Sequence, residues 1–122
     1  MTKVFVSGSR SVRALPQAAK ASLDTIIELG FTAIIGDCYG VDTLVQDYLA
    51  SKGYQQVIVY HIGTTPRNNR GFGAQRVSGS RQTDKDAAMA TAADSGLAIW
   101  DGRSPGTQKN IERVAKTKVL RV

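Results

Sequence analysis

Short, continuous apolar runs recur along the chain and predict buried β-strands. Most of their residues are β-branched or aromatic, and polar positions do not interrupt them. The runs are Val4-Phe5-Val6, Ala33-Ile34-Ile35, Val57-Ile58-Val59, Leu97-Ala98-Ile99-Trp100 and Val119-Leu120. A strand covered on both faces carries such a run, whereas a half-exposed strand alternates apolar with polar residues. The pattern therefore predicts a parallel sheet with helices on both sides.

Helical patterns separate most of these runs. Apolar residues recur three or four positions apart within 19–27, 41–49 and 111–118. Pro16 suits the first turn of the first helix, and Gly30 suits its end. A further, alanine-rich helix is expected after Thr83-Asp84-Lys85-Asp86, because this tetrapeptide resembles a capping box.

The order of these elements predicts an α/β fold over a single domain, residues 1–122. Strands and helices alternate, which favours right-handed crossovers and a three-layer α/β/α arrangement. We expect a five-stranded parallel sheet with strand order 3-2-1-4-5. Ligands of such sheets bind beyond the carboxyl ends of the strands, near the point where the order reverses.

Residues 61–82 interrupt this rhythm with about twenty residues of almost no apolar content. The segment is rich in glycine and carries four arginines: Arg67, Arg70, Arg76 and Arg81. Irregular segments of this length are uncommon in compact domains and are often functional. We interpret it as a ligand-covering loop, with Arg67 as a binding residue. A solvated loop without a ligand is the alternative.

Charge and composition limit the kinds of ligand and partner that we expect for this protein. The 122 residues hold 16 Lys plus Arg against 10 Asp plus Glu, a net charge of +6, which favours an anionic ligand. One cysteine and one histidine give no disulfide and no expected metal site. No apolar run approaches the ~20 residues of a membrane span, and no basic leader opens the chain. We therefore expect a cytoplasmic protein with no membrane partner.

Three glycine-bearing loops follow predicted strands and form the candidate binding site. Their candidate ligand-binding residues are Gly8, Ser9 and Arg10, then Gly36, Asp37, Gly40 and Asp42, then Ser104, Gly106 and Thr107. Ser104 and Pro105 suit the N-cap and first position of the last helix, whose free N–H groups can bind a phosphate. Because parallel strands end at one edge, the three loops are expected to lie together.

Fewer residues are candidates for acid–base or nucleophilic catalysis than for ligand binding. Asp37, at the end of a central strand, suits ribose hydroxyls or a metal-bound water, and Asp86 and Asp101 are further acid–base candidates. Cys38 would need a base as partner, and His61 has no evident link to it. Tyr39, in a glycine loop, is a candidate for stacking on a base.

The ordered motifs resemble those of the SLOG superfamily. They are Gly8-Ser9-Arg10, Gly36-Asp37-x-x-Gly40-Val41-Asp42, Lys85-Asp86-x-x-Met89 and Ser104-x-Gly106-Thr107. These are Rossmann-like domains related to the lonely-guy nucleotide phosphoribohydrolases, the DNA-processing protein A group and the molybdenum-cofactor carrier proteins. The resemblance implies a nucleotide-type ligand at these loops, Lys85 among its binding residues, and a homo-oligomer.

The chain also departs from the phosphoribohydrolases. Their last helix carries Gly-Thr-x-Glu-Glu, whereas Gly106-Thr107 is followed here by Gln108, Lys109 and Asn110. Lysine also replaces arginine in the Arg-Lys-x-x-Met element. The favoured function is therefore binding of a small phosphorylated, nucleotide-derived ligand by a sensor or carrier. Hydrolysis of a nucleotide N-glycosidic bond is the alternative, and single-stranded nucleic-acid binding by the arginine-rich segment is the second alternative.

Overall fold

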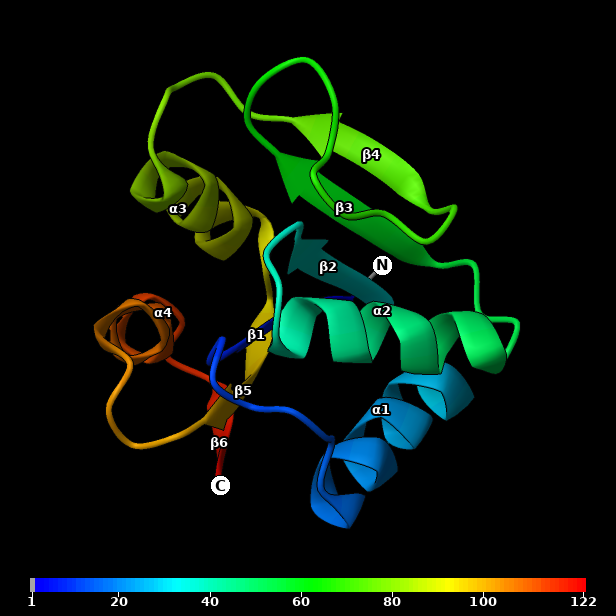
Figure 1. Ribbon diagram of the computed structural model, residues 1–122. Coiled ribbons are helices and arrows are strands. Elements are labelled where there is room, and N and C mark those ends of the chain that lie inside the picture. Colours follow the sequence, from blue (N-terminus) through cyan, green and yellow to red (C-terminus); the bar gives the residue numbers. More distant parts are fainter. Residues whose placement is uncertain (1) are drawn as a thin grey trace.

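Six parallel strands form one sheet at the centre of the protein, as a computed structural model describing residues 2–122 shows (Figure 1). The strands are β1 (Lys3–Gly8), β2 (Thr32–Gly36), β3 (Val57–His61), β4 (Gly73–Arg76), β5 (Ser95–Trp100) and β6 (Thr117–Arg121). The helices are α1 (Gln17–Leu29), α2 (Val41–Ser51), α3 (Gln82–Ala92) and α4 (Pro105–Arg113). The fold is thus α/β and Rossmann-like, as predicted. None of the helices within residues 2–122 has the length and apolarity needed to cross a membrane.

The strand order is β4-β3-β2-β1-β5-β6. The five strands predicted from apolar runs take the predicted order 3-2-1-4-5, and every pairing is parallel. The predicted number of strands was wrong, because β4 adds a sixth at the β3 edge. β4 lies inside the segment 61–82, which we had expected to be irregular.

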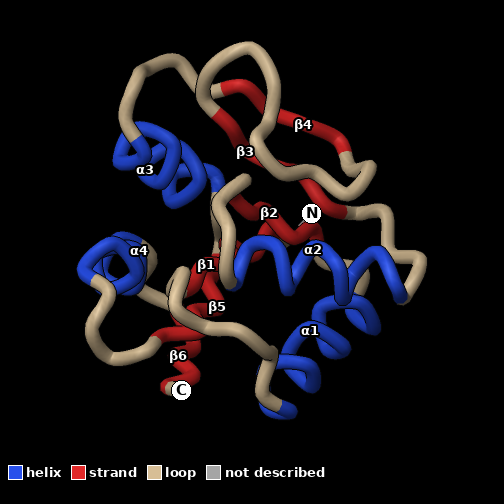
Figure 2. Tube along the Cα trace, viewed as in Figure 1, coloured by secondary structure: helices blue, strands red, loops and turns tan. Residues whose placement is uncertain are grey.

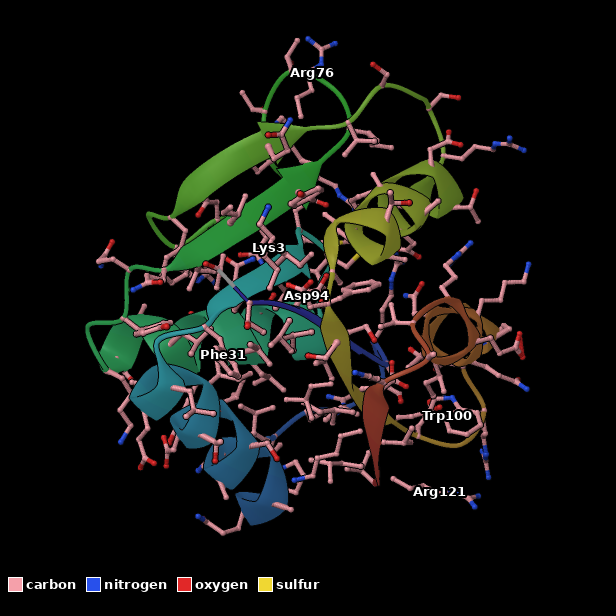
Figure 3. All side chains as sticks on the ribbon, turned by 180° about the vertical axis from the view of Figure 1, so that it is seen from behind. Lys3, Phe31, Arg76, Asp94, Trp100 and Arg121 are labelled. Atoms are coloured by element: carbon pink, nitrogen blue, oxygen red, sulfur yellow. The ribbon has the colours of Figure 1, made fainter. Side chains whose placement is uncertain are left out.

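β4 lacks an apolar run because it is an edge strand held by backbone pairing. All four of its residues are exposed, and it pairs with β3 in a register that joins Val59 to Ala74. A turn stabilised by Asn69 precedes it: the Asn69 side chain accepts from the Phe72 N–H at 2.8 Å and donates to the Phe72 carbonyl at 2.9 Å. Phe72 itself is buried in the core. Figure 2 shows the long connection around β4, and Figure 3 shows Arg76 at this outer edge.

Helices cover both faces of the sheet, which explains the unbroken apolar runs. α1 and α2 lie on one face, and α3 and α4 lie on the other (Figure 1). Successive side chains of a strand point to opposite faces. In β1, Val4 and Val6 accordingly join the cluster beneath α1 and α2, while Phe5 joins Met89 of α3 in a second cluster.

Some helix ends follow the local sequence signals and others do not. α3 begins at Gln82, so Thr83–Asp86 lie inside the helix rather than before it, and its N-cap residue is Arg81. α1 stops at Gly30, whose φ of 68° is readily adopted only by glycine. Ser104 is the N-cap residue of α4 and Pro105 opens the helix, as predicted. Pro16, expected in the first turn of α1, is instead its N-cap residue. The starts of α1 and α4 fix where the loops that follow β1 and β5 finish.

Candidate functional site

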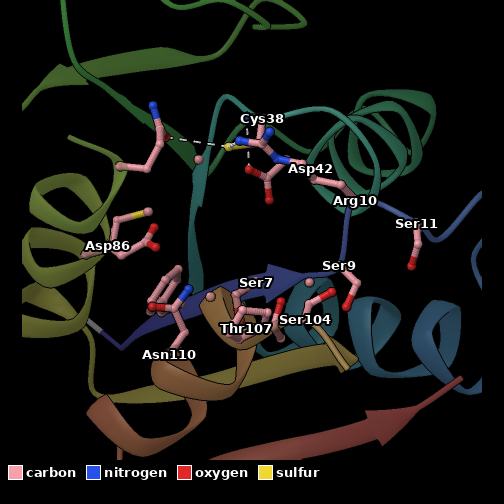
Figure 4. Close-up of a pocket in the computed structure, with 17 residues that line it drawn as sticks. Ser7, Ser9, Arg10, Ser11, Cys38, Asp42, Asp86, Ser104, Thr107 and Asn110 are labelled. Carbon is pink, nitrogen blue, oxygen red and sulfur yellow. Dashed lines mark hydrogen bonds between the residues drawn. The ribbon is translucent and has the colours of Figure 1, made fainter. Parts of the chain in front are cut away.

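A cavity of about 510 Å³ opens at the carboxyl edge of β1, β2 and β5 (Figure 4). Its lining comes from β1, from the end of β2, from the loops that follow β1, β2 and β5, and from helices α2, α3 and α4. The lining residues are Phe5, Ser7, Gly8, Ser9, Arg10, Ser11, Gly36, Cys38, Asp42, Gln82, Asp86, Met89, Ser104, Pro105, Gly106, Thr107 and Asn110. The three loops that the sequence singled out therefore meet at one cavity.

Most of the predicted binding residues line this cavity, and the rest lie outside its lining. Those on its wall are Gly8, Ser9, Arg10, Gly36, Asp42, Ser104, Gly106 and Thr107, together with the acid–base candidate Asp86. Those that do not line it are Asp37, Gly40, Arg67, Lys85 and Asp101. The second group supports the wall.

Two glycines let the first two loops approach each other. A Cβ on Gly8 would come within 2.4 Å of the Val41 side chain at the start of α2. Gly40 has a φ of +78°, and a Cβ there would lie 2.5 Å from the backbone of Arg10. Glycine removes both clashes, so the β1 and β2 loops can pack backbone to backbone around the cavity.

Asp37 sits at the centre of a buried ion-pair cluster. Its Oδ1 accepts from Lys85 Nζ at 2.8 Å and from Arg67 Nη2 at 3.1 Å, and its Oδ2 accepts from the Arg67 backbone N–H at 2.9 Å. Burial acts to raise the pKa of Asp37, but these hydrogen bonds outweigh it and lower the pKa to about 2. We expected Asp37 to face ribose hydroxyls or a metal-bound water. Both of its oxygens instead hold protein cations.

Lys85 is the second buried member of this cluster. Its side chain is 1% exposed, as is that of Asp37. An ammonium group in such a place needs an opposite charge, because a lone buried charge is strongly destabilising. The ion pair joins α3 to the end of β2, and Arg67 adds the segment before β4. Lys85, predicted to bind the ligand, pairs with Asp37 and does not line the cavity.

The segment 62–72 is fixed along α2 rather than left free. Asn68 donates to Thr43 Oγ1 at 2.6 Å and to the Cys38 carbonyl at 3.2 Å. The buried Gln46 side chain bonds to the backbone of Gly36, Asn68 and Arg70. Arg70 pairs with Asp47 at 2.7 Å. Arg67 and Arg70 are therefore engaged by carboxylates of the protein.

Asp101 forms hydrogen bonds that join the loop after β1 to the loop before α4. Its oxygens accept from Ser11 Oγ at 2.7 Å, from the Arg103 and Ser104 N–H groups at 2.8 Å each, and from Ser104 Oγ at 2.9 Å. The hydrogen bond from Ser11, followed by those from Ser104 and Arg103, holds the pKa of Asp101 well below its usual range. This acid–base candidate therefore joins the β1 loop to the start of α4 and lies outside the cavity lining.

Asp42 and Asp86 are the two carboxyl groups that line the cavity. Burial raises the pKa of Asp42 to about 7, although the Cys38 N–H donates to its Oδ2 at 3.1 Å. Burial also raises the pKa of Asp86, against the lowering effects of Lys85 and Asn110. Carboxyl groups with raised pKa values inside a cavity are a common mark of functional sites.

Within residues 2–122, Arg10 is the one Lys or Arg side chain that lines the cavity. Its guanidinium contacts Cys38 Sγ at 3.6 Å, and no carboxylate within residues 2–122 forms an ion pair with it. The first turn of α4 lies on the same cavity, with Gly106 exposed and Thr107 buried. N–H groups in a helical first turn lack intrahelical partners and attract anions. The cavity thus combines a free guanidinium, several hydroxyl groups and a helix start.

Cys38 is surrounded by cations rather than by a base. Its Sγ lies 3.2 Å from Arg67 Nη2 and 3.4 Å from Lys85 Nζ. His61 is not among its hydrogen-bond partners, and His61 Nδ1 is buried without a partner. The structure therefore gives no Cys38–His61 pair. Among residues 2–122, no group of three or more His, Cys, Asp or Glu side chains is arranged to hold a metal ion.

Some residues of the cavity wall were not predicted from the sequence. Phe5 and Met89 read as core residues, and each is buried while also lining the cavity. Asn110 carried one usable signal, because it lies three residues after Thr107 and so shares its helix face. Tyr39, the stacking candidate, is 65% exposed and borders a separate shallow hollow beside Arg10 and Arg13.

No protein-family model matches the chain, and no curated protein matches it.

We predict that Asp37→Asn lowers the free energy of unfolding by about 3–5 kcal/mol, because the buried Lys85 side chain loses its carboxylate partner. The double variant Asp37→Asn/Lys85→Met should recover part of this loss, since it also removes the buried ammonium group. Chemical denaturation of the three proteins measures both effects. A loss below about 1 kcal/mol for Asp37→Asn would contradict the role of the pair.

We predict that Asp42→Asn is more stable than the unmodified protein at pH 8. The folded state raises the pKa of Asp42 from 3.8 to about 7, so it binds the proton more tightly than the unfolded chain does. Stability is therefore lost as pH rises from about 4 to 7, at about 1.4 kcal/mol per unit of pKa shift. The expected gap is about 4 kcal/mol at pH 8 and falls below about 1 kcal/mol near pH 4.

Thermal unfolding across this pH range measures the gap, with Glu28→Gln on the exposed face of α1 as the control. Parallel pH profiles for Asp42→Asn and the unmodified protein would show that Asp42 ionises normally.

Proposed function

We propose that the cavity binds a nucleotide or nucleotide-derived phosphorylated ligand, with its phosphate between Arg10 and the first turn of α4. The observation that carries the proposal is the meeting of an unpaired guanidinium with a helix start in one cavity. Both features attract a phosphate, and Arg10 can hold it through two parallel hydrogen bonds. The excess of positive charge in the chain favours the same ligand class.

The size of the cavity supports a ligand larger than phosphate alone. Its volume of about 510 Å³ falls within the usual range for small-molecule sites, about 300–1,000 Å³. A nucleoside monophosphate has the size to fill it. The proposal also agrees with the SLOG-type motifs, since Gly8-Ser9-Arg10, Gly36 and Gly106-Thr107 all border the cavity. Membership of that superfamily, a cytoplasmic location and homo-oligomer formation stay predictions.

Binding of single-stranded nucleic acid has less support. The arginines Arg67 and Arg70 are paired with carboxylates, and Phe72, the aromatic residue of this segment, is buried. Single-strand binding normally uses exposed aromatic platforms on which bases stack. A small phosphorylated ligand therefore remains the favoured partner.

We predict that Arg10→Ala weakens binding of a nucleoside monophosphate by about tenfold or more, because a charge-assisted bidentate contact is lost. The matched control is Arg103→Ala, which removes the same charge from an exposed residue outside the cavity lining. Isothermal titration calorimetry of AMP and GMP measures the affinities. No heat of binding with either nucleotide, or equal losses for the two variants, would contradict the proposal.

Hydrolysis of the N-glycosidic bond is a second candidate, favoured by Asp42. A carboxyl group with a pKa of about 7 can protonate a leaving base near neutral pH, while water attacks the sugar carbon. The candidates for the general acid are therefore the two cavity residues Asp42 and Asp86, in place of Asp37 and Asp101. Chromatography of a nucleoside monophosphate incubated with the protein should then show free base, and Asp42→Asn should abolish its release. Equal release by that variant would exclude Asp42 as the acid.

A further inference from the structure

The two ends of the cavity differ in chemistry. Arg10 and Ser11 lie at one end, and Asp86 and Asn110 lie at the other (Figure 4). Phe5 and Met89 also line the cavity, and their side chains are 3% and 1% exposed. They belong to the apolar cluster formed between α3 and the sheet. One end of the cavity therefore has a cation that suits a phosphate. The other end has a carboxylate, and apolar side chains form part of the wall.

Asp86 is held in a fixed orientation by α4. The polar side chain of Asn110 acts to lower the pKa of Asp86, and the Asn110 Oδ1 accepts from Arg113 Nη1 at 2.7 Å. Arg113 Nη1 also lies 4.0 Å from Asp86 Oδ2. Because Arg113 occupies the amide oxygen, the Asn110 NH₂ group is the one that faces the carboxylate. Asp86 is thus anchored as a hydrogen-bond acceptor, with acceptor capacity left on the side of the cavity.

A carboxylate in this position needs donors from the ligand. The Asp86 side chain is 20% exposed, and burial already disfavours its charge. A ligand that removes the remaining water must replace the lost hydrogen bonds, or the carboxylate is left unsatisfied. The neighbouring apolar side chains suit a flat ring. The matching group is therefore a heterocycle with two adjacent N–H donors on its edge.

We propose that the cavity selects a guanine nucleotide, with Asp86 accepting from the ring N1–H and the 2-amino group. This inference rests on the proposed nucleotide-binding function and names its ligand class. Guanine presents two neighbouring donors that match the two lone-pair directions of a carboxylate. Adenine presents a ring acceptor at the same place, which would face the Asp86 carboxylate without a hydrogen. Hypoxanthine keeps the ring N–H but lacks the 2-amino donor.

Calorimetry with four nucleotides tests this assignment on the unmodified protein. GMP should bind about tenfold more tightly than IMP, and more tightly still than AMP, because a bidentate contact discriminates by about this factor or more. The deoxy form, dGMP, should bind as well as GMP. A ribose role for Asp86 predicts the reverse, with dGMP weakened and the bases not distinguished.

The variant Asp86→Asn exchanges one carboxylate oxygen for an NH₂ donor at nearly constant shape. It should weaken GMP binding by about tenfold and strengthen binding of XMP, whose ring presents a carbonyl where guanine presents its amine. The control is Glu112→Gln, the same change at an exposed position of α4. The four-nucleotide comparison needs no variant, so it decides the question even if Asp86→Asn fails to fold.

The outcomes separate the two proposals. GMP and AMP binding with equal affinity would overturn guanine selection and leave nucleotide binding standing, as would an unchanged GMP preference in Asp86→Asn. Weaker binding of dGMP than of GMP, with no preference among bases, would assign Asp86 to the ribose. No binding of any of the four nucleotides would overturn both proposals.

Discussion

The ion pair between Asp37 and Lys85 is the interaction on which the architecture of this site depends. It joins the end of β2 to α3 with both side chains 1% exposed, and Arg67 extends it to the segment before β4. Two charges removed from water are stable only with good geometry and further hydrogen bonds, and Asp37 meets this condition with three donor groups. Because α3 carries Asp86 and Met89, the pair also sets the position of one cavity wall.

This arrangement divides the charged residues into two classes. Asp37, Lys85 and Arg67 neutralise one another behind the wall, whereas Arg10, Asp42 and Asp86 face the cavity without such complete pairing. Burial raises the pKa of both Asp42 and Asp86. At about 7, the pKa of Asp42 leaves this carboxyl group uncharged at acidic pH, where it does not repel an anionic ligand. The site is thereby suited to accept a phosphate beside carboxyl groups.

Much of the fold could be predicted because the signals are local. Apolar runs such as Val4-Phe5-Val6 mark strands buried on both faces, and parallel strands place their following loops at one edge. The meeting of Gly8, Gly36 and Gly106 around one cavity follows from that geometry. β4 could not be predicted, since an edge strand held by backbone pairing needs no apolar residue.

The roles of the charged residues depended on contacts between distant positions. Nothing near Asp37 in the sequence shows that Lys85, 48 residues later, fills its acceptor sites. The same holds for Asp101, whose partner Ser11 lies 90 residues earlier. Strand-end position therefore identified the neighbourhood of the cavity correctly, but it could not separate residues that face a ligand from those that support the wall.

In the proposed site, the β1 loop and the start of α4 together hold a negatively charged group. Amide NMR spectra of the protein, at 13.1 kDa well suited to this method, can be recorded during titration with a nucleoside monophosphate. Saturable shifts are expected to centre on the backbone N–H groups of residues 8–11 and 106–107. Shifts that are absent, or that centre on another surface such as the β4 edge, would contradict it.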